Sequence, residues 1–520
     1  MNRRDFFLTA AAAGSVPLFG ASGTRLGLVR SNHTRLARPA PLDDPLSYEQ
    51  VRDMVFRAIS LAGGPERQIK PGSWVVIKPN IVALRPRPSY RTGDITDFRV
   101  TRAVVEYVAR HSRAGRITVA EGGSYRSTSD PATDSAVLQG GRRVSAYEFD
   151  WGAEEFPGFD GSLRTMLERA RRTFPDKHFD YIDLSYDAVR DPSGAFRRIE
   201  VPRAPTGAGA FGGRPDYFVT NTILNCDFLI TVPVMKVHNE CGITASLKNY
   251  VGTAPREAYG APGIFSNTGL HSQHSAGGRI DPFIVDLAAF HPPDYCVVDG
   301  IRGLQSSEHS NHRPDQMIQS NLVFAGRDPV AADALAARLT GFDPHDMEFL
   351  HMAEARGMGT MDFRRIDVRG DEPDRYQRTW EKPRRWYGRC NREWSVLVDG
   401  APRRYTAPFD TLDLPAAAGS RSAAYAALTE VESAGHRDGF LWIGLRGALT
   451  AKVNGETVAE FNSATRYRVG QFQYPVALRP GRNRLEFEVR PVNGEALLSA
   501  LLTGPRNDGD TLDGIRWMAA

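Results

Sequence analysis

The fold is decided by the stretch Phe228-Leu-Ile-Thr-Val-Pro-Val-Met-Lys-Val-His238-Asn-Glu-Cys-Gly-Ile-Thr-Ala-Ser-Leu-Lys248-Asn-Tyr-Val-Gly252. Its first five residues form an apolar run, which is typical of a strand buried on both faces of a sheet. Lys236 and His238 follow this strand, and a loop of small residues leads to Lys248 and Asn249. Two ammonium groups, an imidazole and an amide behind a buried strand cost free energy unless something binds there. The stretch therefore also marks a candidate functional site.

Short apolar runs alternate with amphipathic segments from residue 46 to residue 370. This alternation predicts an α/β domain with a Rossmann-like parallel sheet. The expected strands are 74–77, 117–120, 228–232, 295–298 and 322–325. The expected helices are 48–62, 100–111, 281–290, 329–339 and 347–356. Residues 124–220 break the pattern and are expected to be a long insertion, with a helix over 163–173 and a strand over 181–184.

A second, all-β domain is expected over residues 396–505, after a linker over residues 371–395 that is rich in Arg, Trp, Tyr and Pro. Asn454-Gly455 predicts a hairpin turn between alternating strands, and the whole is expected to be a sandwich. The turns Val453-Asn-Gly-Glu456 and Leu478-Arg-Pro-Gly-Arg-Asn483 precede the strand Leu485-Glu-Phe-Glu-Val489. This order resembles galactose-binding-like modules of carbohydrate-active enzymes, which implies either sugar binding or a packing role.

The N-terminus has the pattern of an export signal. Arg3-Arg4 precedes Phe6-Phe-Leu8 and an alanine-rich stretch over residues 9–21 that is too short for a membrane span. We expect a twin-arginine signal peptide over residues 1–30, the twin-arginine translocase as partner during export, and a periplasmic or secreted protein. This route moves folded proteins, often with cofactors already inserted.

Composition narrows the class of partner. A formal charge of +4 spread over 520 residues, with both signs interspersed, argues against a nucleic-acid binder. No later apolar run has the length of a stable membrane span. We therefore expect a small-molecule or glycan-derived ligand.

The four cysteines, Cys226, Cys241, Cys296 and Cys390, share no close spacing, which disfavours a Cys-x-x-Cys zinc site and an iron–sulfur cluster. One or two disulfides are possible in an oxidising compartment, but the spacing does not choose the pairs. Cys226 and Cys296 flank apolar strands and are expected to be buried thiols.

Eight of the twelve histidines lie between His238 and His351. His271 and His274 have His-x-x-His spacing, as do His309 and His312, and either pair provides two ligands for a divalent metal. Solvated loop histidines are the alternative for each pair. The stretch Thr206-Gly-Ala-Gly-Ala-Phe-Gly-Gly213 contains Gly-x-Gly-x-x-Gly, but prolines flank it, which favours a loop over a dinucleotide site.

Lys78 and Asn80 stand at the carboxyl end of the strand over 74–77, and Lys236 and His238 follow the strand over 228–232 in the same way. The carboxyl edge of a doubly wound sheet is where ligands bind. Together these side chains predict one cationic crevice for an anionic group, with Thr244 and Asn249 as further contacts. A buried lysine stem or a packed histidine is the alternative for each residue alone.

Four blocks resemble the family known as domain of unknown function 362: "VVIKPNIV", "VPVMKVHNECGITASLKNYVG", "VVDGIRG" and "FAGRDPVAADALAARLTGFDP". The resemblance covers about residues 70–370 and implies the fold and the position of the site more than an activity. Two departures are visible. The cysteines of the cluster domain that many members carry are missing, and 304–314 replaces a glycine-rich stretch.

A second resemblance is to nickel-dependent lactate racemase and its relatives. In that family a histidine is followed ten residues later by a lysine across a glycine-containing loop, as are His238 and Lys248. The resemblance implies a proton-transferring His238 and a Lys248 that carries a nickel-pincer nucleotide or holds an anion. Asp94, Thr96 and Arg102 are similar to the substrate-binding segment of that family.

The sequence thus favours an exported enzyme acting on a small anionic or sugar-derived hydroxy compound. It would be an isomerase or epimerase working by proton or hydride chemistry with a metal cofactor. His238 and Lys248 are the expected catalytic residues; Lys78, Asn80, Lys236, Thr244 and Asn249 the expected binding residues. Two alternatives remain: a non-catalytic periplasmic carbohydrate- or metal-binding protein, and a metal-assisted hydrolase.

Overall fold

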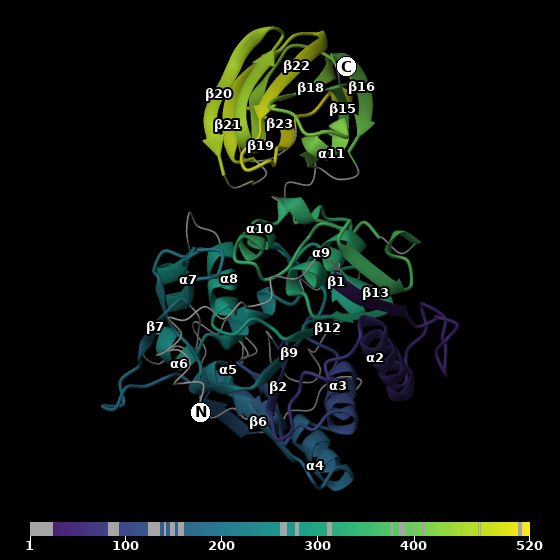
Figure 1. Cartoon of the computed structure of the whole chain (residues 1–520), viewed down its shortest axis with the longest axis vertical. Coiled ribbons are helices and arrows are strands. Elements are labelled where there is room, and N and C mark those ends of the chain that lie inside the picture. The colour runs from purple at the N-terminus through teal and green to yellow at the C-terminus, as the bar shows by residue number, and fades with distance from the viewer. Residues whose placement is uncertain are drawn as a thin grey trace.

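The computed structural model describes most of the chain beyond residue 23. The described residues are 24–81, 93–122, 136–139, 142–145, 151–153, 161–260, 268–275, 280–308, 315–375, 378–383, 390–398, 400–407, 411–465, 467, 470–507 and 512–520. An α/β domain carries a C-terminal β domain above α10 (Figure 1).

The α/β domain is built on one eight-stranded sheet with the order β14-β1-β13-β12-β9-β2-β3-β6. In that order the strands are Ile366–Gly370, Thr24–Arg30, Met317–Gly326, Tyr295–Leu304, Phe228–Val232, Trp74–Pro79, Arg116–Glu121 and His178–Asp183. Neighbours from β12 to β6 are parallel, as are β1 and β14. The sheet is nevertheless mixed, because β13 returns antiparallel to β12 and also pairs antiparallel with β1. The expected α/β fold is confirmed, and its sheet is mixed and mostly parallel.

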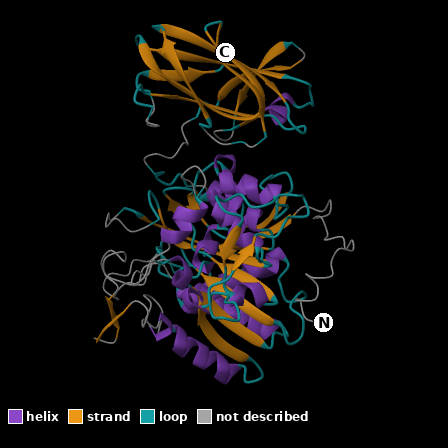
Figure 2. Cartoon of the chain, turned by 90° about the vertical axis from the view of Figure 1, so that its left-hand side faces the viewer, coloured by secondary structure: helices purple, strands orange, loops and turns teal. Residues whose placement is uncertain are grey.

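Helices cover both faces of this sheet (Figure 2). One core contains Val75 and Ile77 of β2 together with α2 (Tyr48–Ala62), α3 (Phe98–His111) and α4 (Leu163–Thr173). The opposite core contains Val76 with α8 (Asp281–Ala289), α9 (Pro329–Leu339) and α10 (Glu348–Ala355). Successive side chains of a strand point to opposite faces, so a continuously apolar strand serves both cores.

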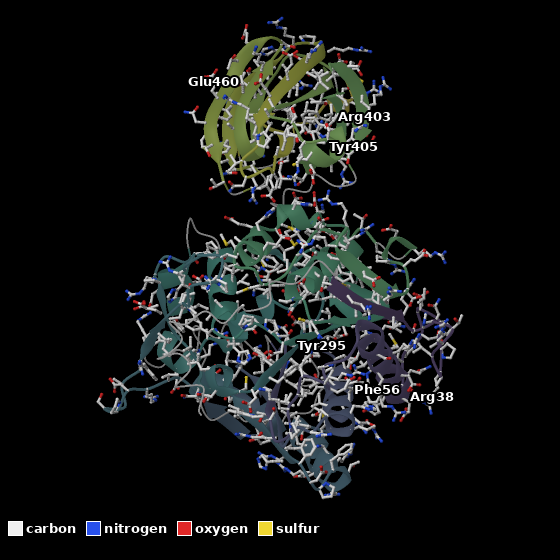
Figure 3. All side chains as sticks on the ribbon, in the orientation of Figure 1. Arg38, Phe56, Tyr295, Arg403, Tyr405 and Glu460 are labelled. Carbon is white, nitrogen blue, oxygen red and sulfur yellow. The ribbon has the colours of Figure 1, made fainter. Side chains whose placement is uncertain are left out.

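The helix signals in the sequence act as expected. The predicted bounds of α2 and α9 agree with the structure. Asp328 caps α9 by accepting a hydrogen bond from the Ala331 N–H at 2.8 Å, and Gly341 after its end has a φ of 79°. On the other side of the sheet the Tyr295 hydroxyl, labelled in Figure 3, donates to the Ile59 carbonyl of α2 at 3.3 Å.

The start of the α/β domain lies earlier than the sequence indicates. Residues 1–30 are expected as signal peptide and the domain from residue 46, but Thr24–Arg30 is strand β1, buried from residue 26 onwards. It pairs with β13 on one side and with β14 on the other. An interior strand cannot be part of a removable segment, so the expected boundary at residue 30 is wrong.

The expected insertion over residues 124–220 is in part a continuation of the domain. Helix α4 matches its predicted range, and β6 is the strand at one end of the main sheet. The loop with Gly-x-Gly-x-x-Gly follows; its Phe211 and Gly212 N–H groups donate to the Asp286 carboxylate of α8 at 2.8–3.0 Å. A carboxylate of the same chain thus occupies these backbone donors. Smaller elements here are β4 (Ala136–Gln139), β5 (Arg142–Ser145), β7 (Arg198–Glu200), β8 (Asp216–Phe218) and α5 (Asn221–Asn225).

The C-terminal domain is a curled antiparallel sheet in which the 17-residue strand β19 (Arg437–Val453) pairs with four other strands. Within β19, Gly447 has a φ of 140° and marks an irregularity in the pairing with β20. Asn454 and Gly455, with φ of 51° and 86°, form the expected hairpin turn. The other elements are β15 (Glu393–Val398), β16 (Ala401–Thr406), β17 (Leu412–Asp413), α11 (Leu414–Ala418), β18 (Tyr425–Ser433), β20 (Glu456–Ala464), β21 (Phe472–Leu478), β22 (Gly481–Arg490), β23 (Leu497–Thr503) and β24 (Ile515–Met518).

The two domains touch through polar and aromatic groups. The Thr411 N–H donates to Asp343 Oδ2 at 2.8 Å, and the rings of His351 and Tyr467 lie 5.5 Å apart. The expected linker is partly built into the α/β domain, since Trp380 is buried in its core.

All four cysteines are free and buried, which confirms the expected thiols at Cys226 and Cys296. Within the described part of the chain, no helix is both long and apolar enough to cross a membrane.

Candidate anion-binding site

The site lies where β2 and β9 end side by side in the sheet. After β9 the chain forms a two-stranded ribbon of β10 (Lys236–His238) and β11 (Gly242–Thr244), followed by the 3₁₀ helix η4 (Lys248–Thr253). In the ribbon Lys236 faces Thr244 and His238 faces Gly242, whose φ of 85° permits the tight reversal. The Met235 N–H donates to the Asp299 carbonyl of β12 at 2.8 Å, which ties the ribbon to the sheet.

Lys78 is fully buried and lies at the bottom of the site. Its ammonium donates to Glu121 Oε2 at 2.8 Å, to Asn249 Oδ1 at 2.9 Å and to the Pro79 carbonyl at 3.2 Å. The Asn249 amide donates in return to the Lys78 carbonyl at 2.9 Å. Burial lowers the pKa of Lys78, and the Glu121 carboxylate opposes that shift. Lys78 and Asn249, both expected to bind ligand, are thus bound to each other.

Gly252 shows how closely the Lys78–Glu121 ion pair is packed against η4. A Cβ at residue 252 would lie 2.1 Å from Glu121 Oε1 and 2.8 Å from Lys78 Nζ. The ion pair therefore fits beneath η4 only because that position has no side chain.

Lys236 is nearly as deeply buried. Its ammonium donates to the Asp94 carbonyl at 2.5 Å and lies 3.6 Å from Asp94 Oδ1. Burial lowers the pKa of Lys236, and the positive charge of Lys248 adds to this effect. The neighbouring Thr96 hydroxyl donates to the Val232 carbonyl at 2.7 Å and accepts from the Asn80 N–H at 2.8 Å.

Thr244 Oγ1 and Asn80 Oδ1 are buried at this edge without a hydrogen-bond partner among the described residues. Buried polar atoms are normally satisfied, so a ligand hydroxyl is a fitting partner for either. Arg102, in contrast, lies over the Tyr48 ring at 3.7 Å, on the α2–α3 side.

Lys248 differs from both other lysines. It is half-buried, and its ammonium forms no hydrogen bond or ion pair with any residue that the structure describes. Burial lowers the pKa values of Lys78, Lys236 and His271, and the charge of Lys248 adds to each shift. Burial raises the pKa of the Cys241 thiol, and the charge of Lys248 opposes that shift. Lys248 is therefore a cation central to the site and lacks a protein carboxylate as partner in the described chain.

His238 is buried, and one hydrogen bond defines the role of its Nδ1 atom. The Glu240 N–H donates to His238 Nδ1 at 3.2 Å. An accepting Nδ1 carries no proton, so the neutral ring bears its proton on Nε2. In this tautomer Nε2 of His238 is a hydrogen-bond donor.

The two histidines of α7 (Thr268–His274) have different surroundings. The His271 ring packs edge-on against Phe283, while His274 stacks on Tyr217 at 3.7 Å and shares a 3.1 Å hydrogen bond with the Tyr259 hydroxyl. Burial lowers the pKa of each to about 4. Within the described residues no three His, Cys, Asp or Glu side chains group as metal ligands. His309 and His312 lie outside the described residues.

The structure thus brings Lys78, Lys236, Lys248 and Asn249 together and shows three participants that the sequence reasoning missed. Glu121 directly follows the predicted strand over 117–120, as Lys78 follows the strand over 74–77. The rule that ligands bind at the carboxyl edge of a doubly wound sheet could therefore have found it. Arg256 of α6 (Arg256–Tyr259) is buried, and its charge also lowers the pKa of Lys78. Asp333, a charged residue on the buried α9, binds the turn before Lys248.

The family comparison agrees with the sequence motifs. Residues 194–338 match the model of the family described as domain of unknown function (DUF362). This part of the chain is a DUF362 domain. It contains β9, the β10–β11 ribbon, η4 and α9, and thus most of the site.

No curated protein sequence matches the chain. Among solved structures, the lactate racemase apoprotein from Thermoanaerobacterium thermosaccharolyticum aligns at 12% identity with a TM-score of 0.27, over 53% of this chain and 52% of the racemase. A family 35 carbohydrate-binding module from an environmental isolate aligns at 16% identity with a TM-score of 0.15, over 19% of this chain and 74% of the module. A β-glucosidase from Kluyveromyces marxianus aligns at 10% identity with a TM-score of 0.18, over 22% of this chain and 17% of the glucosidase.

Proposed function

We propose that the DUF362 domain binds a small anionic hydroxy compound at the carboxyl edge of the sheet and exchanges a proton with it. Lys248 carries the proposal: it is a half-buried ammonium among other cations, without a carboxylate partner in the described chain. A site with excess positive charge favours an anionic ligand, and the low dielectric of its surroundings strengthens the attraction.

The neighbouring residues support a division of roles. Lys78 and Lys236 are paired with Glu121 and Asp94, so their ammonium groups are already engaged within the protein. Lys248 is left to bind the anion directly. The buried oxygens of Thr244 and Asn80 would take a hydroxyl group of the same ligand.

His238 supports the proton exchange in this proposal. The carbon-bound proton of the ligand passes to solvent water and returns from it, while the Nε2–H of His238 donates a hydrogen bond to the adjacent ligand oxygen and stabilises the negative charge that develops there. The reaction class is an isomerisation or epimerisation next to an anionic group. We assign no metal ligand among the described residues. We further propose that the protein is exported, which fractionation of the periplasm would test.

The test is calorimetric titration with lactate and glycerate as hydroxy-acid probes and inorganic phosphate as an anion without a carbon-bound hydroxyl. Lys248→Met should weaken hydroxy-acid binding about 10- to 100-fold, because it removes a charge-assisted hydrogen bond that contributes about 1.5–3 kcal/mol to the binding free energy. Lys452→Met, which removes one exposed lysine of β19, is the matched control and should bind like the wild type. Equal affinities for wild type and Lys248→Met would refute the proposal.

Exchange of the probe's carbon-bound hydrogen with deuterated solvent, followed by NMR, tests the role of His238. His238→Leu, which removes the side-chain N–H donor, should retain the affinity and lose the exchange. Undiminished exchange in that variant would show that His238 is not needed for the proton exchange. Absence of exchange in the wild type with every probe would show that the protein binds the compound without catalysing proton exchange.

A further inference from the structure

The turn that leads into Lys248 is held by a carboxylate from a distant helix. Asp333 of α9 is fully buried, and its oxygens accept hydrogen bonds from the Ser246 N–H at 2.6 Å and the Leu247 N–H at 3.0 Å. These two donors stand at the start of η4, where backbone N–H groups have no partner within the helix.

Side-chain contacts hold the same turn to the sheet. The Ser246 hydroxyl lies 2.6 Å from the Thr231 hydroxyl of β9 and 3.0 Å from the Cys296 sulfur of β12. On the other side of Lys248, Asn249 is bound to Lys78 of β2. The backbone on both sides of Lys248 is therefore anchored, while its ammonium has no partner among the described residues.

We propose that Asp333 is the positioning residue of the site: it fixes the 246–247 turn so that Lys248 meets the anionic ligand already in place. This inference rests on the proposed function. A loose turn would have to be ordered when the ligand binds, and that ordering would subtract from the affinity. Asp333 would act through Lys248 and would not touch the ligand.

The same helix offers a matched control. Asp328 is also buried and also accepts two backbone N–H groups, from Ala331 at 2.8 Å and Thr360 at 3.1 Å. Burial raises the pKa of both carboxyls to about 7. The two residues therefore share burial and bonding, but only Asp333 contacts the turn before Lys248.

The experiment compares Asp333→Asn with Asp328→Asn in the full-length protein. Titration with glycerate measures affinity, and hydrogen exchange measures the protection of the 246 and 247 amides. Asp333→Asn should weaken binding about tenfold and speed exchange at these two amides, whereas Asp328→Asn should leave both unchanged. In a Lys248→Met background, Asp333→Asn should weaken binding no further.

The outcomes separate the two ideas. If Lys248→Met weakens binding but Asp333→Asn binds like the wild type, the positioning role is refuted and the proposed function stands. If Lys248→Met binds like the wild type, the proposed function is refuted. Should Asp333→Asn fail to fold, Ser246→Ala repeats the comparison, because it removes the contacts of the same turn to β9 and β12; unchanged affinity together with faster exchange would then refute the inference.

Discussion

At the scale of single residues, the site contains two kinds of lysine: Lys78 and Lys236 are engaged with protein acceptors, whereas Lys248 has no hydrogen-bond or ion-pair partner among the described residues. Lys78 and Glu121 form an ion pair with both side chains at most 2% exposed. Glu121 also accepts from the Ile81 N–H at 3.1 Å and the Gly122 N–H at 2.8 Å, so its charge is satisfied from several sides. Breaking such a pair by removing one partner leaves an uncompensated buried charge, whereas replacing both need not be costly.

Lys78→Met is therefore expected to destabilise the α/β domain by about 3–5 kcal/mol, measured by urea unfolding. The double variant Lys78→Met/Glu121→Gln should recover part of this loss, because no charge is then left unpaired. Lys452→Met should change the free energy of unfolding by less than about 0.5 kcal/mol. A Lys78→Met protein as stable as wild type would show that Glu121 finds another partner.

At the scale of elements, helix α7 illustrates histidines used for packing. His274 is fully buried between Tyr217 and Tyr259, and burial lowers its pKa from 6.5 to about 4. A group with a depressed pKa stays neutral in the fold while the unfolded chain takes up a proton. The resulting stability is fully present above pH 6.5 and is lost as the pH falls from 6.5 towards 4.

Acidification over this window should accordingly lower the free energy of unfolding, with His274 contributing on the order of 2 kcal/mol. His274→Gln keeps a hydrogen-bonding group for the Tyr259 hydroxyl and cannot titrate, so its stability should fall less steeply between pH 6.5 and 4. Thermal unfolding across this range gives the comparison. Parallel curves for the two proteins would rule out His274 as a source of the acid sensitivity.

At the scale of the whole molecule, the sheet depends on both ends of the α/β domain's chain. β1 lies between β13 and β14, so the first described residues join strands that come some 300 residues later in the sequence. Its central side chains Leu26 and Leu28 are completely buried. Any processing of the N-terminus compatible with the fold must therefore leave β1 in the mature protein.

A chain that starts at residue 24 should fold with the stability of the full-length protein, while a chain that starts at residue 31 should lose the cooperative unfolding of the α/β domain. Circular dichroism during thermal unfolding distinguishes the two. For a protein exported as proposed above, N-terminal sequencing of the mature form should find a start at or before Thr24. A folded chain beginning at residue 31 would show that β14 and β13 can close without β1.

Local sequence determined much of this protein. The bounds of α2 and α9, the strand β9, the turn at Asn454-Gly455 and the division into an α/β domain and a β domain follow from periodicity, capping and turn residues. Each depends on neighbours within a few positions along the chain. The strand rule also predicts that Lys78 and Lys236 lie at one edge of the sheet.

Only the tertiary structure decided what these residues do. Lys78 meets Glu121 43 positions away, and Ser246 meets Asp333 87 positions away. Such contacts depend on which strands become neighbours in the sheet, information that no local pattern carries. The same packing engages Lys78 and Lys236 with protein acceptors, anchors the turn around Lys248 and leaves Lys248 as the cation available to a ligand.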